Sequence, residues 1–370
     1  MKNKILLLSS EFPPQPGGIG HQAFNLAREL SVAGRELTVL TNSRGQKDRA
    51  KEQAFDEVLP FKVVRVPRYA LAGFSYLMRL IRLLKIRFQY PSCTLISSGQ
   101  FSLWMGYLVK KIFPESYAIS ILHGSELEGE GFRKFLTHKS LSVYDQHIAV
   151  SGFTQHKLLV SHPGARVRVI NNGFDPGKFS RRTGNNPIKK RGYPTLITLG
   201  NLSRRKGQHH VIQALPALRK IYPDIHYHLV GIPTERKRLY ALAEKLGVLR
   251  QVDFHGPLDD AAAADLLQGS DVFVLLSENT PEGDVEGFGI AILEANALGL
   301  PAIGSTGCGI EDAIRDGYSG RLVDGQNPAE LYAALEEILK NHPVYAENAR
   351  IWANAFTWKI KGQEYLELIP

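Results

Sequence analysis

The stretch with the clearest chemistry, residues 282–295, reads EGDVEGFGIAILEA. It follows an apolar segment, residues 271–276, so a loop broken by glycines comes after a predicted strand and leads into a helix. The backbone N–H groups of Phe288, Gly289 and Ile290 lie at the start of that helix, where the helix dipole and the unpaired N–H groups attract an anion. The pattern therefore predicts an anion-binding turn.

Two carboxylates frame this turn, Glu286 in the loop and Glu294 within the helix. The helix is otherwise apolar, and a carboxylate in apolar surroundings needs hydrogen-bond donors. Vicinal sugar hydroxyls are suitable donors. The alternative is a capping acid followed by a salt-bridged core acid, which explains each glutamate but not the whole pattern.

Three consecutive cations, Arg204, Arg205 and Lys206, precede Gly207 where another predicted strand ends and a helix begins. Like charges at a helix N-terminus oppose the dipole and call for an anion, so we expect them to clamp a diphosphate. A solvated basic helix start is the alternative. The spacing does not separate Arg204 from Arg205 as the main diphosphate ligand.

Two further features lie in the first half of the chain. The loop at residues 12–20 contains Gly17, Gly18 and Gly20, which allow close approach of a ligand but equally suit a plain tight turn. Its spacing is not the G-x-G-x-x-G of dinucleotide-binding folds. His123 follows an apolar segment and precedes Gly-Ser-Glu, a setting for a functional histidine, although a lone histidine at a strand end is more often structural.

No metal site is expected. The Asp284-Val285-Glu286 sequence resembles a D-x-D motif but lies in the wrong context, and nearby cations already neutralise a diphosphate. The pairs His209-His210 and His226-x-His228 lack a third ligand at suitable spacing. We therefore predict no essential metal and no other cofactor.

Short apolar segments alternate with helical patterns along the whole chain, which predicts parallel sheets built from βαβ units. The first series of expected strands covers residues 4–9, 36–41, 63–66, 94–97, 117–122, 147–150 and 166–170. The second covers residues 195–200, 226–230, 252–255, 272–276, 301–304 and 320–323. An aperiodic stretch, residues 171–191, reads as a linker between them. The sequence predicts two doubly wound α/β domains, whose ligands bind at the carboxyl ends of the strands.

With these motifs in this order, the chain resembles retaining GT-B glycosyltransferases of family GT4, the glycosyl transferases group 1. The matching sequences, in chain order, are Pro16-Gly-Gly-Ile19, Ile121-Leu-His-Gly-Ser-Glu126, Val169-Ile-Asn-Asn-Gly-Phe-Asp175, Arg205-Lys-Gly207, the Glu286/Glu294 pair and Ala297-Leu-Gly-Leu-Pro301. They span nearly the whole chain. The resemblance implies a GT-B fold: a domain of residues 1–177 joined by a returning helix at 358–370, and a domain of residues 178–357, facing each other across a cleft. The final helix, expected over residues 352–368, should cross back to the N-terminal domain.

The resemblance also implies roles for individual residues. Glu294 would bind the ribose hydroxyls of a nucleotide sugar, and Glu286 would contact the donor sugar. Arg205 and Lys206 would bind the diphosphate with backbone N–H groups of the 288–290 turn and of Gly18. His123 would hold a donor-sugar hydroxyl near the anomeric carbon, and backbone groups near residues 256–258, including Leu258, would hold the base. Many relatives carry Gly-Arg-Leu where this chain has Gly200-Asn201-Leu202, so the diphosphate arginine must be Arg205 or Arg204.

Composition limits the remaining classes. The 370 residues are 44% hydrophobic and 22% charged, which excludes a disordered or fibrous chain. Two cysteines cannot form a disulfide framework, which suits a reducing compartment. No apolar run approaches the ~18 residues that a membrane span needs, and the apolar start of the chain is too short for a secretory signal and is expected to be a buried strand.

Basic charge is concentrated in the first half: residues 1–180 hold 24 Lys+Arg against 13 Asp+Glu. Residues 74–90 form an amphipathic helix pattern, with Leu77, Ile81, Leu84 and Phe88 on one face and Arg79, Arg82 and Lys85 on another. Such a helix can lie in an anionic membrane interface, and residues 101–113 are a second candidate for the same surface. A surface helix packed on the sheet is the alternative.

We therefore expect a glycosyltransferase that moves a sugar from a UDP- or GDP-sugar to a glycan or lipid-linked acceptor in cell-envelope polysaccharide or lipopolysaccharide synthesis. It would be cytoplasmic and peripherally bound to the inner face of the cell membrane, with no nucleic-acid partner. The alternatives are a soluble GT-B relative, such as a sugar-nucleotide epimerase or a disaccharide-forming synthase, a Rossmann oxidoreductase, and a nucleic-acid binder. The last two are disfavoured by the missing G-x-G-x-x-G and by the lack of an aromatic RNA-binding motif.

Overall fold

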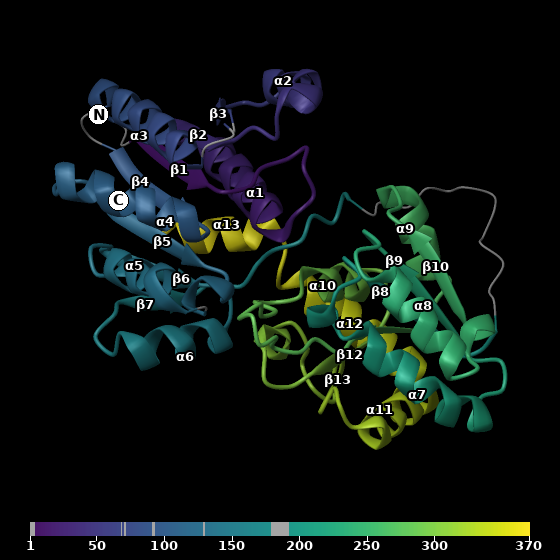
Figure 1. Cartoon of the computed structure of the whole chain (residues 1–370). Helices are drawn as coiled ribbons and strands as arrows, with labels where there is room; N and C mark the ends of the chain where they lie inside the picture. Colours follow the sequence, from purple (N-terminus) through teal and green to yellow (C-terminus); the bar gives the residue numbers. More distant parts are fainter. Residues whose placement is uncertain (1–3, 68, 70–71, 91–92, 129, 179–191) are drawn as a thin grey trace. The chain divides into compact units, whose positions relative to one another are not determined.

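A computed structural model describes residues 4–67, 69, 72–90, 93–128, 130–178 and 192–370 (Figure 1). The chain divides into two compact units. Unit 1 consists of residues 1–172 and 358–370, and unit 2 of residues 173–357. The predicted linker, residues 171–191, is described only as far as residue 178, and its remainder lies outside the described residues.

Unit 1 is built on a seven-stranded sheet in the order β3-β2-β1-β4-β5-β6-β7, and every neighbouring pair is parallel. The strands are β1 (Lys4–Ser9), β2 (Leu37–Asn42), β3 (Lys62–Val66), β4 (Cys93–Ser98), β5 (Ala118–Leu122), β6 (Gln146–Ala149) and β7 (Val167–Val169). The helices are α1 (Gly18–Val32), α2 (Arg49–Glu57), α3 (Ala72–Gln89), α4 (Gln100–Ile112), α5 (Gly131–Leu141), α6 (Gly152–Ser161) and α13 (Trp358–Leu366). The order turns around at β1 and β4, so ligands are expected beyond the carboxyl ends of these strands.

The central strands of this sheet are buried on both faces. All six residues of β1 are buried, as a parallel strand covered by helices on both sides requires. Leu6 and Leu8 belong to one apolar cluster with Leu83 of α3 and Leu103 of α4, so α3 and α4 pack on the face to which the even-numbered residues of β1 point. The carboxyl ends of β1, β4 and β5 remain available to position polar side chains.

Two arginines of helix α3 are buried, against expectation. The sequence placed Arg79 on a basic face of the helix, but Arg79 is only 2% exposed and donates hydrogen bonds to the Ser9 carbonyl (2.8 Å) and to Ser102 Oγ (3.3 Å). Arg87 is buried as well. Leu77 and Phe88 are 50% and 69% exposed, so this part of the apolar face is not packed on the sheet as the alternative required. The periodicity identified the helix but not its buried arginines, because their partners come from other elements.

The chain returns to unit 1 at its end, but not as one long helix. The expected helix over residues 352–368 is divided: α12 (His342–Asn354) belongs to unit 2, and α13 begins only at Trp358. In unit 1, α13 packs closely on α1 (Figure 1), because Gly362 lies against Glu29 and Tyr365 accepts a hydrogen bond from Gln22 Nε2 (3.0 Å). The break lets the chain leave one unit and join the other.

Unit 2 repeats the architecture with a six-stranded parallel sheet in the order β10-β9-β8-β11-β12-β13. Its strands are β8 (Thr195–Leu199), β9 (His226–Val230), β10 (Val252–Gly256), β11 (Val272–Leu275), β12 (Ala302–Ser305) and β13 (Gly320–Val323). Its helices are α7 (Gln208–Ile221), α8 (Arg236–Lys245), α9 (Asp260–Gln268), α10 (Ile290–Ala297), α11 (Pro328–Lys340) and α12, with short 3-10 turns at η3 (Arg204–Lys206) and η5 (Gly309–Asp312). The prediction of two doubly wound parallel sheets is confirmed.

Among the described residues, no helix combines the length and apolar character needed to cross a bilayer.

Candidate functional site

Arg204, Arg205 and Lys206 lie at the carboxyl edge of the unit 2 sheet. Gly207 allows this because its backbone can approach the end of β11 closely. Gly207 has a φ of +67°, and a Cβ at this position would lie 1.6 Å from the carbonyl oxygen of Leu276, just after β11. The N–H of Glu278 donates to the Arg205 carbonyl (2.9 Å), which holds η3 against the segment after β11. This contact fixes the backbone that carries the cations.

Glu286 gathers two of these cations. Lys206 Nζ lies 2.6 Å from Glu286 Oε2, Arg205 Nη1 donates to the same oxygen, and Arg205 Nε lies 3.0 Å from Asp284 Oδ2. Burial by itself would raise the pKa of Glu286, but Lys206 and Arg205 outweigh it and hold the pKa below its usual range. The carboxylate is therefore ionised at neutral pH and orients both cations.

Arg204 points to different partners. Its side chain is half exposed, and Nε lies 2.9 Å from Glu278 Oε1. Arg205 is only 20% exposed and shares Glu286 with Lys206. The geometry thus favours Arg205 over Arg204 as the arginine that acts with Lys206.

Helix α10 begins beside this cluster with open backbone donors. Its N-cap, Gly289, adopts a φ of +90° and provides no side-chain cap, so the first N–H groups of the helix face outward from its start. The Phe288 side chain is buried and packs on Phe356, with ring centroids 6.0 Å apart. Phe288, Gly289 and Ile290 can therefore contribute backbone N–H groups, as expected from the sequence.

Glu294, inside α10, forms an ion pair that the sequence did not reveal. Lys178 Nζ lies 2.8 Å from Glu294 Oε1 and 3.8 Å from Asp260 Oδ1 at the start of α9. Burial raises the pKa of Glu294, and Lys178 only partly offsets that rise. The lysine lies 116 residues from the glutamate and follows an Asn-Gly-Phe-Asp-Pro-Gly segment with no helical or strand periodicity, so no local signal pointed to it. Leu258 lies, half-buried, in the loop between β10 and α9.

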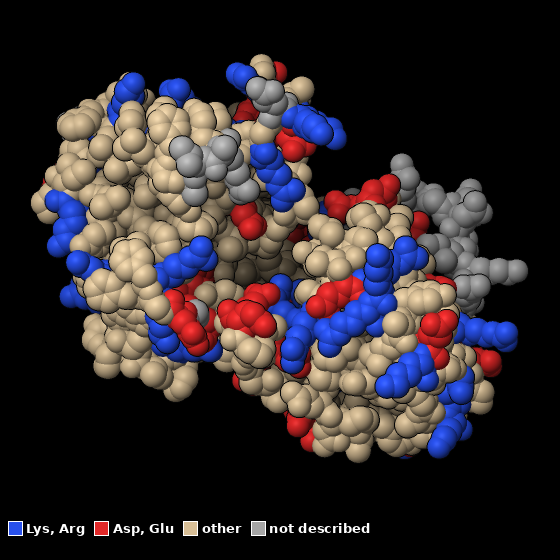
Figure 2. Space-filling model, in the orientation of Figure 1, with Lys and Arg blue, Asp and Glu red and all other residues tan. Residues whose placement is uncertain are grey.

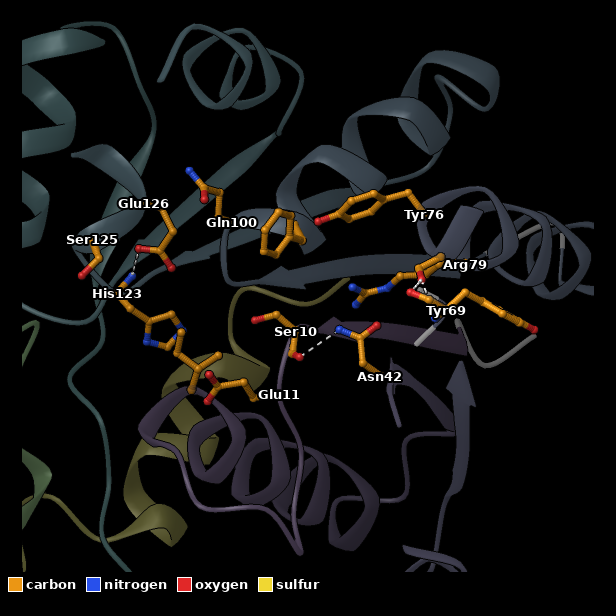
Figure 3. Close-up of a pocket in the computed structure, with 13 residues that line it drawn as sticks. Ser10, Glu11, Asn42, Tyr69, Tyr76, Arg79, Gln100, His123, Ser125 and Glu126 are labelled. Carbon is orange, nitrogen blue, oxygen red and sulfur yellow. Dashed lines mark hydrogen bonds between the residues drawn. The ribbon is translucent and has the colours of Figure 1, made fainter. Parts of the chain in front are cut away.

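Unit 1 has a separate cavity of about 510 Å³ beyond the carboxyl ends of its central strands (Figure 3). Its lining residues are Ser10, Glu11, Ile19, Asn42, Tyr69, Ser75, Tyr76, Arg79, Gln100, Phe101, His123, Ser125 and Glu126. Figure 3 shows His123 and Glu126 at one end and Tyr69, Arg79 and Asn42 toward the other. Gly18, which opens α1, is exposed, and its neighbour Ile19 lines the cavity.

His123 and Glu126 occupy the buried end of this cavity. His123 Nε2 lies 2.9 Å from Ser98 Oγ, and the backbone N–H of His123 donates to Glu126 Oε2 (3.0 Å). Burial lowers the pKa of His123 to about 4 and raises the pKa of Glu126 to about 7. Among the described residues, Glu126 Oε1 is buried without a hydrogen-bond partner. The sequence placed Glu126 in a motif but gave it no role.

Aromatic side chains form another part of the cavity wall. The rings of Tyr76 and Phe101 lie 5.4 Å apart, and Phe101 contacts Trp104 edge-on at 5.2 Å. Together with Glu11, Gln100 and Glu126, they make a pocket with apolar faces and several hydrogen-bonding groups. Such a lining suits a ring that has both an apolar face and hydroxyl groups.

The histidine pairs of unit 2 each have a third neighbour that could act as a ligand, although none stands at suitable sequence spacing. His209 and His210 lie with Glu278, and His226 and His228 lie with Asp253; in each group one ligand atom per residue lies within 4.8 Å of the others. The third residue comes from another strand or loop, so sequence spacing did not reveal it.

Two doubly wound parallel sheets are the GT-B fold, which solved structures share with this chain. A family model described as "Glycosyltransferase Family 4" matches residues 16–178, and one described as "Glycosyl transferases group 1" matches residues 181–357. The chain belongs to this glycosyltransferase family.

Similar proteins agree with this assignment. A D-inositol 3-phosphate glycosyltransferase of Corynebacterium urealyticum is 32% identical over 59% of this chain, a match that spans only about half (52%) of that relative. A GDP-mannose-dependent alpha-(1-6)-phosphatidylinositol monomannoside mannosyltransferase of Mycolicibacterium smegmatis is 26% identical over 99% of this chain and 98% of the relative. Sucrose-phosphate synthase from Thermosynechococcus elongatus shares the fold with a TM-score of 0.81 at 20% identity, over 99% of this chain and 98% of that chain. HepE from Anabaena, solved with UDP and glucose, superimposes with a TM-score of 0.78 at 22% identity over 99% of both chains.

We predict that Gly207→Ala destabilises unit 2 by about 3 kcal/mol or more, because the new methyl group would collide with the Leu276 carbonyl in addition to adopting a left-handed backbone. Gly247→Ala is the matched control: its φ is +68° and nothing lies within 4 Å of the added carbon, so it should cost only about 1 kcal/mol. Denaturant unfolding followed by fluorescence measures both. Equal losses in the two variants would contradict the close approach of Gly207 to the end of β11.

We predict that Glu126→Gln changes how stability depends on pH. Since the pKa of Glu126 is about 7 when folded and about 4.5 when unfolded, the folded wild type binds more protons between these values, and its stability falls as pH rises from about 4.5 to 7. Glutamine cannot ionise and keeps an oxygen for the His123 N–H. The free energy of unfolding, wild type minus variant, should therefore decrease over this range by up to about 3 kcal/mol. A difference that is flat with pH would show that Glu126 has an ordinary pKa.

Proposed function

We propose that this glycosyltransferase moves a sugar, with retention of anomeric configuration, from a UDP- or GDP-sugar to a glycan or lipid-linked acceptor of the cell envelope. The observation that carries the proposal is the convergence in unit 2 of Arg205, Lys206 and Glu286 at the sheet edge that also bears helix α10. This is a preorganised site for a diphosphate leaving group. The relative that depends on GDP-mannose and the solved neighbour with UDP and glucose support a nucleotide-sugar donor.

In the proposed donor complex the charges in unit 2 have distinct tasks. Lys206 and Arg205 stabilise the negative charge that develops on the diphosphate as the bond to the sugar breaks, and the N–H groups at residues 288–290 add to this effect. Glu286 keeps both cations in place and contacts the donor sugar. Glu294 accepts hydrogen bonds from the ribose hydroxyls. Lys178 partly neutralises the buried Glu294 carboxylate. Leu258 and its neighbours contact the base through backbone groups.

The proposed reaction needs no nucleophile from the protein. The bond from the anomeric carbon to the diphosphate oxygen breaks, the acceptor oxygen forms a bond on the same face of the sugar, and the departing diphosphate takes the acceptor proton. His123 has a pKa of about 4 and is neutral at pH 7, so it acts by hydrogen bonding a sugar hydroxyl and not as an acid. Because cations and helix N–H groups neutralise the leaving group, we propose that the reaction needs no metal.

We propose that the cavity of unit 1 binds the acceptor end that reacts. Tyr76 and Phe101 present ring surfaces on which the apolar face of a sugar can stack. Glu11 and Glu126 offer oxygen acceptors for hydroxyl groups. Because Ser10, Asn42 and Gln100 also line this cavity, a hydroxyl-rich sugar finds several hydrogen-bonding partners there.

A surface on α3, α4 and α5 is proposed to contact an anionic membrane. Large apolar side chains are 36–74% exposed there: Phe74, Leu77, Phe88, Leu108, Ile112, Phe132 and Phe135. Figure 2 shows that the molecular surface over these helices is mostly uncharged, with separate Lys and Arg side chains. Exposed aromatic groups beside cations are typical of interfacial binding. The enzyme would then act on lipid-linked acceptors at the inner face of the membrane, whereas a soluble GT-B relative would show no membrane dependence.

We predict that one nucleoside diphosphate, UDP or GDP, binds and that Arg205→Ala, Lys206→Ala and Glu294→Ala each weaken its binding at least ~10-fold, because each removes a charged contact to the ligand. Arg204→Ala is the matched control and should change binding less than ~2-fold, because Arg204 is exposed and paired with Glu278. Calorimetric titration with UDP, GDP, ADP and NAD measures these affinities. Binding of NAD alone, or of none of the four, would contradict the donor site.

We predict that the protein sediments with vesicles rich in phosphatidylglycerol and not with phosphatidylcholine vesicles. The double variant Phe132→Ser, Phe135→Ser should reduce the bound fraction ~5-fold or more, since two exposed rings are lost from the interface. The matched control is Val344→Ser, Ile351→Ser, which removes two exposed apolar side chains from unit 2. Equal binding by both double variants, or none by the wild type, would favour the soluble alternative.

A further inference from the structure

Three histidines and an aspartate gather on two neighbouring strands of unit 2, apart from the residues assigned to the donor. His226 and His228 alternate with Tyr227 along β9, and Asp253 and His255 alternate with Phe254 along β10. Tyr227 and Leu229 belong to the apolar core, so His226 and His228 point to the opposite face of the sheet. The register pairs Asp253 with His228, which places the polar residues of both strands on that same face.

Their ligand atoms are close together. Asp253 Oδ2 lies 2.8 Å from His226 Nε2 and 3.7 Å from His228 Nδ1, and His255 Nε2 lies 3.0 Å from His228 Nδ1. Four ligands around a tetrahedral zinc ion, at metal–ligand distances of 2.0–2.2 Å, lie about 3.3 Å from one another. The three distances between ligand atoms, 2.8, 3.0 and 3.7 Å, lie on both sides of this value of about 3.3 Å. We propose that His226, His228 and Asp253, with His255 within reach as a fourth ligand, bind a divalent transition-metal ion of the zinc type.

The Nδ1 atom of His228 lies 3.0 Å from His255 Nε2 and 3.7 Å from Asp253 Oδ2, so ligand atoms from both strands surround it. A cation among the four groups accepts a lone pair from each. The ligand chemistry, imidazole with one carboxylate, matches zinc better than calcium or magnesium, which prefer oxygen.

The second histidine group is a weaker candidate. Glu278, which would be its carboxylate ligand, already has Arg204 Nε 2.9 Å from Oε1 and His210 Nε2 3.0 Å from Oε2. The Arg204 guanidinium already neutralises the Glu278 carboxylate, whose negative charge a metal ion would need. This group therefore serves as an internal control for the assignment.

A metal ion at the first group would fasten strand β10 to β9. Strand β10 is the edge strand of the sheet, with β9 as its neighbour in the strand order, and His255 directly precedes Gly256, Pro257 and Leu258. The ion would thus steady the segment proposed to contact the nucleotide base, a consequence that rests on the proposed function, whereas metal binding itself does not.

The test uses the full chain with any affinity tag removed. After loading with Zn²⁺ and dialysis, mass spectrometry of metal content should find about one zinc ion per chain. Asp253→Asn and His226→Gln should each weaken zinc binding at least ~10-fold in competition with a chelating dye. Co²⁺-loaded wild type should show the strong visible absorption of a tetrahedral site, and Asp253→Asn should lose it. Circular dichroism confirms that each variant is folded; Asp253, with 27% of its side chain exposed, is the variant least expected to disturb the core.

Two controls make the outcome decisive. His162→Gln alters a histidine of unit 1 that stacks on His138 and should leave zinc binding unchanged. His210→Gln alters the second group. The proposal is overturned if the wild type retains no zinc, if Asp253→Asn and His226→Gln bind zinc as the wild type does, or if zinc is lost with His210→Gln and kept with Asp253→Asn. Nucleotide titration of the same Asp253→Asn protein separates this result from the donor site: loss of zinc with nucleotide binding retained supports the metal site.

Discussion

The buried carboxylate of Glu286 is the constraint on which unit 2 depends. It stays ionised only because Arg205 and Lys206 lie against it, and these cations reach it only because Gly207 lets the backbone pass directly over the end of β11. A side chain at residue 207 would move both cations, leave a charge in the interior without its partners and disturb the start of α10 nearby. Backbone packing and the ionisation state of Glu286 are therefore one arrangement, held by a glycine that contributes no functional group.

In unit 1, several cations are bonded to groups of the same unit. The excess of basic residues in the first half of the chain suggested a partner of opposite charge, yet several of these cations are used internally. Arg65 bonds Asp56, Arg79 bonds the Ser9 carbonyl, Arg87 bonds Glu115 and Ser116, and Lys110 bonds Asp145. Of these four cations only Arg79 lines the cavity of unit 1, together with hydroxyl, amide, carboxyl and aromatic groups. Net charge counted along a sequence thus overstates what the surface offers, because it does not show which cations are buried.

Much of this organisation follows from local sequence. Apolar runs bounded by glycine and polar residues located the strands to within a residue or two, as for 226–230 and 320–323, and the loop-to-helix pattern located the start of α10. Lys178, the role of Glu126 and the Asp253 partner of two histidines were not predictable in this way. Each is brought to its partner by strand order or by a crossing loop, and single-sequence periodicity contains no information on such long-range pairing. The burial of Arg79 was missed for the same reason, because its acceptors lie on β1 and α4.

The return of α13 to unit 1 has a consequence for synthesis of the chain. Unit 1 is assembled from residues 1–172 and 358–370, and unit 2 is made between these two segments. While the ribosome translates residues 173–357, α1 has emerged without the helix that covers it, so Gln22 and the groove beside Glu29 remain open to water or to chaperones. Unit 2 has all its residues first, and unit 1 can close only when the last turns of helix leave the exit tunnel.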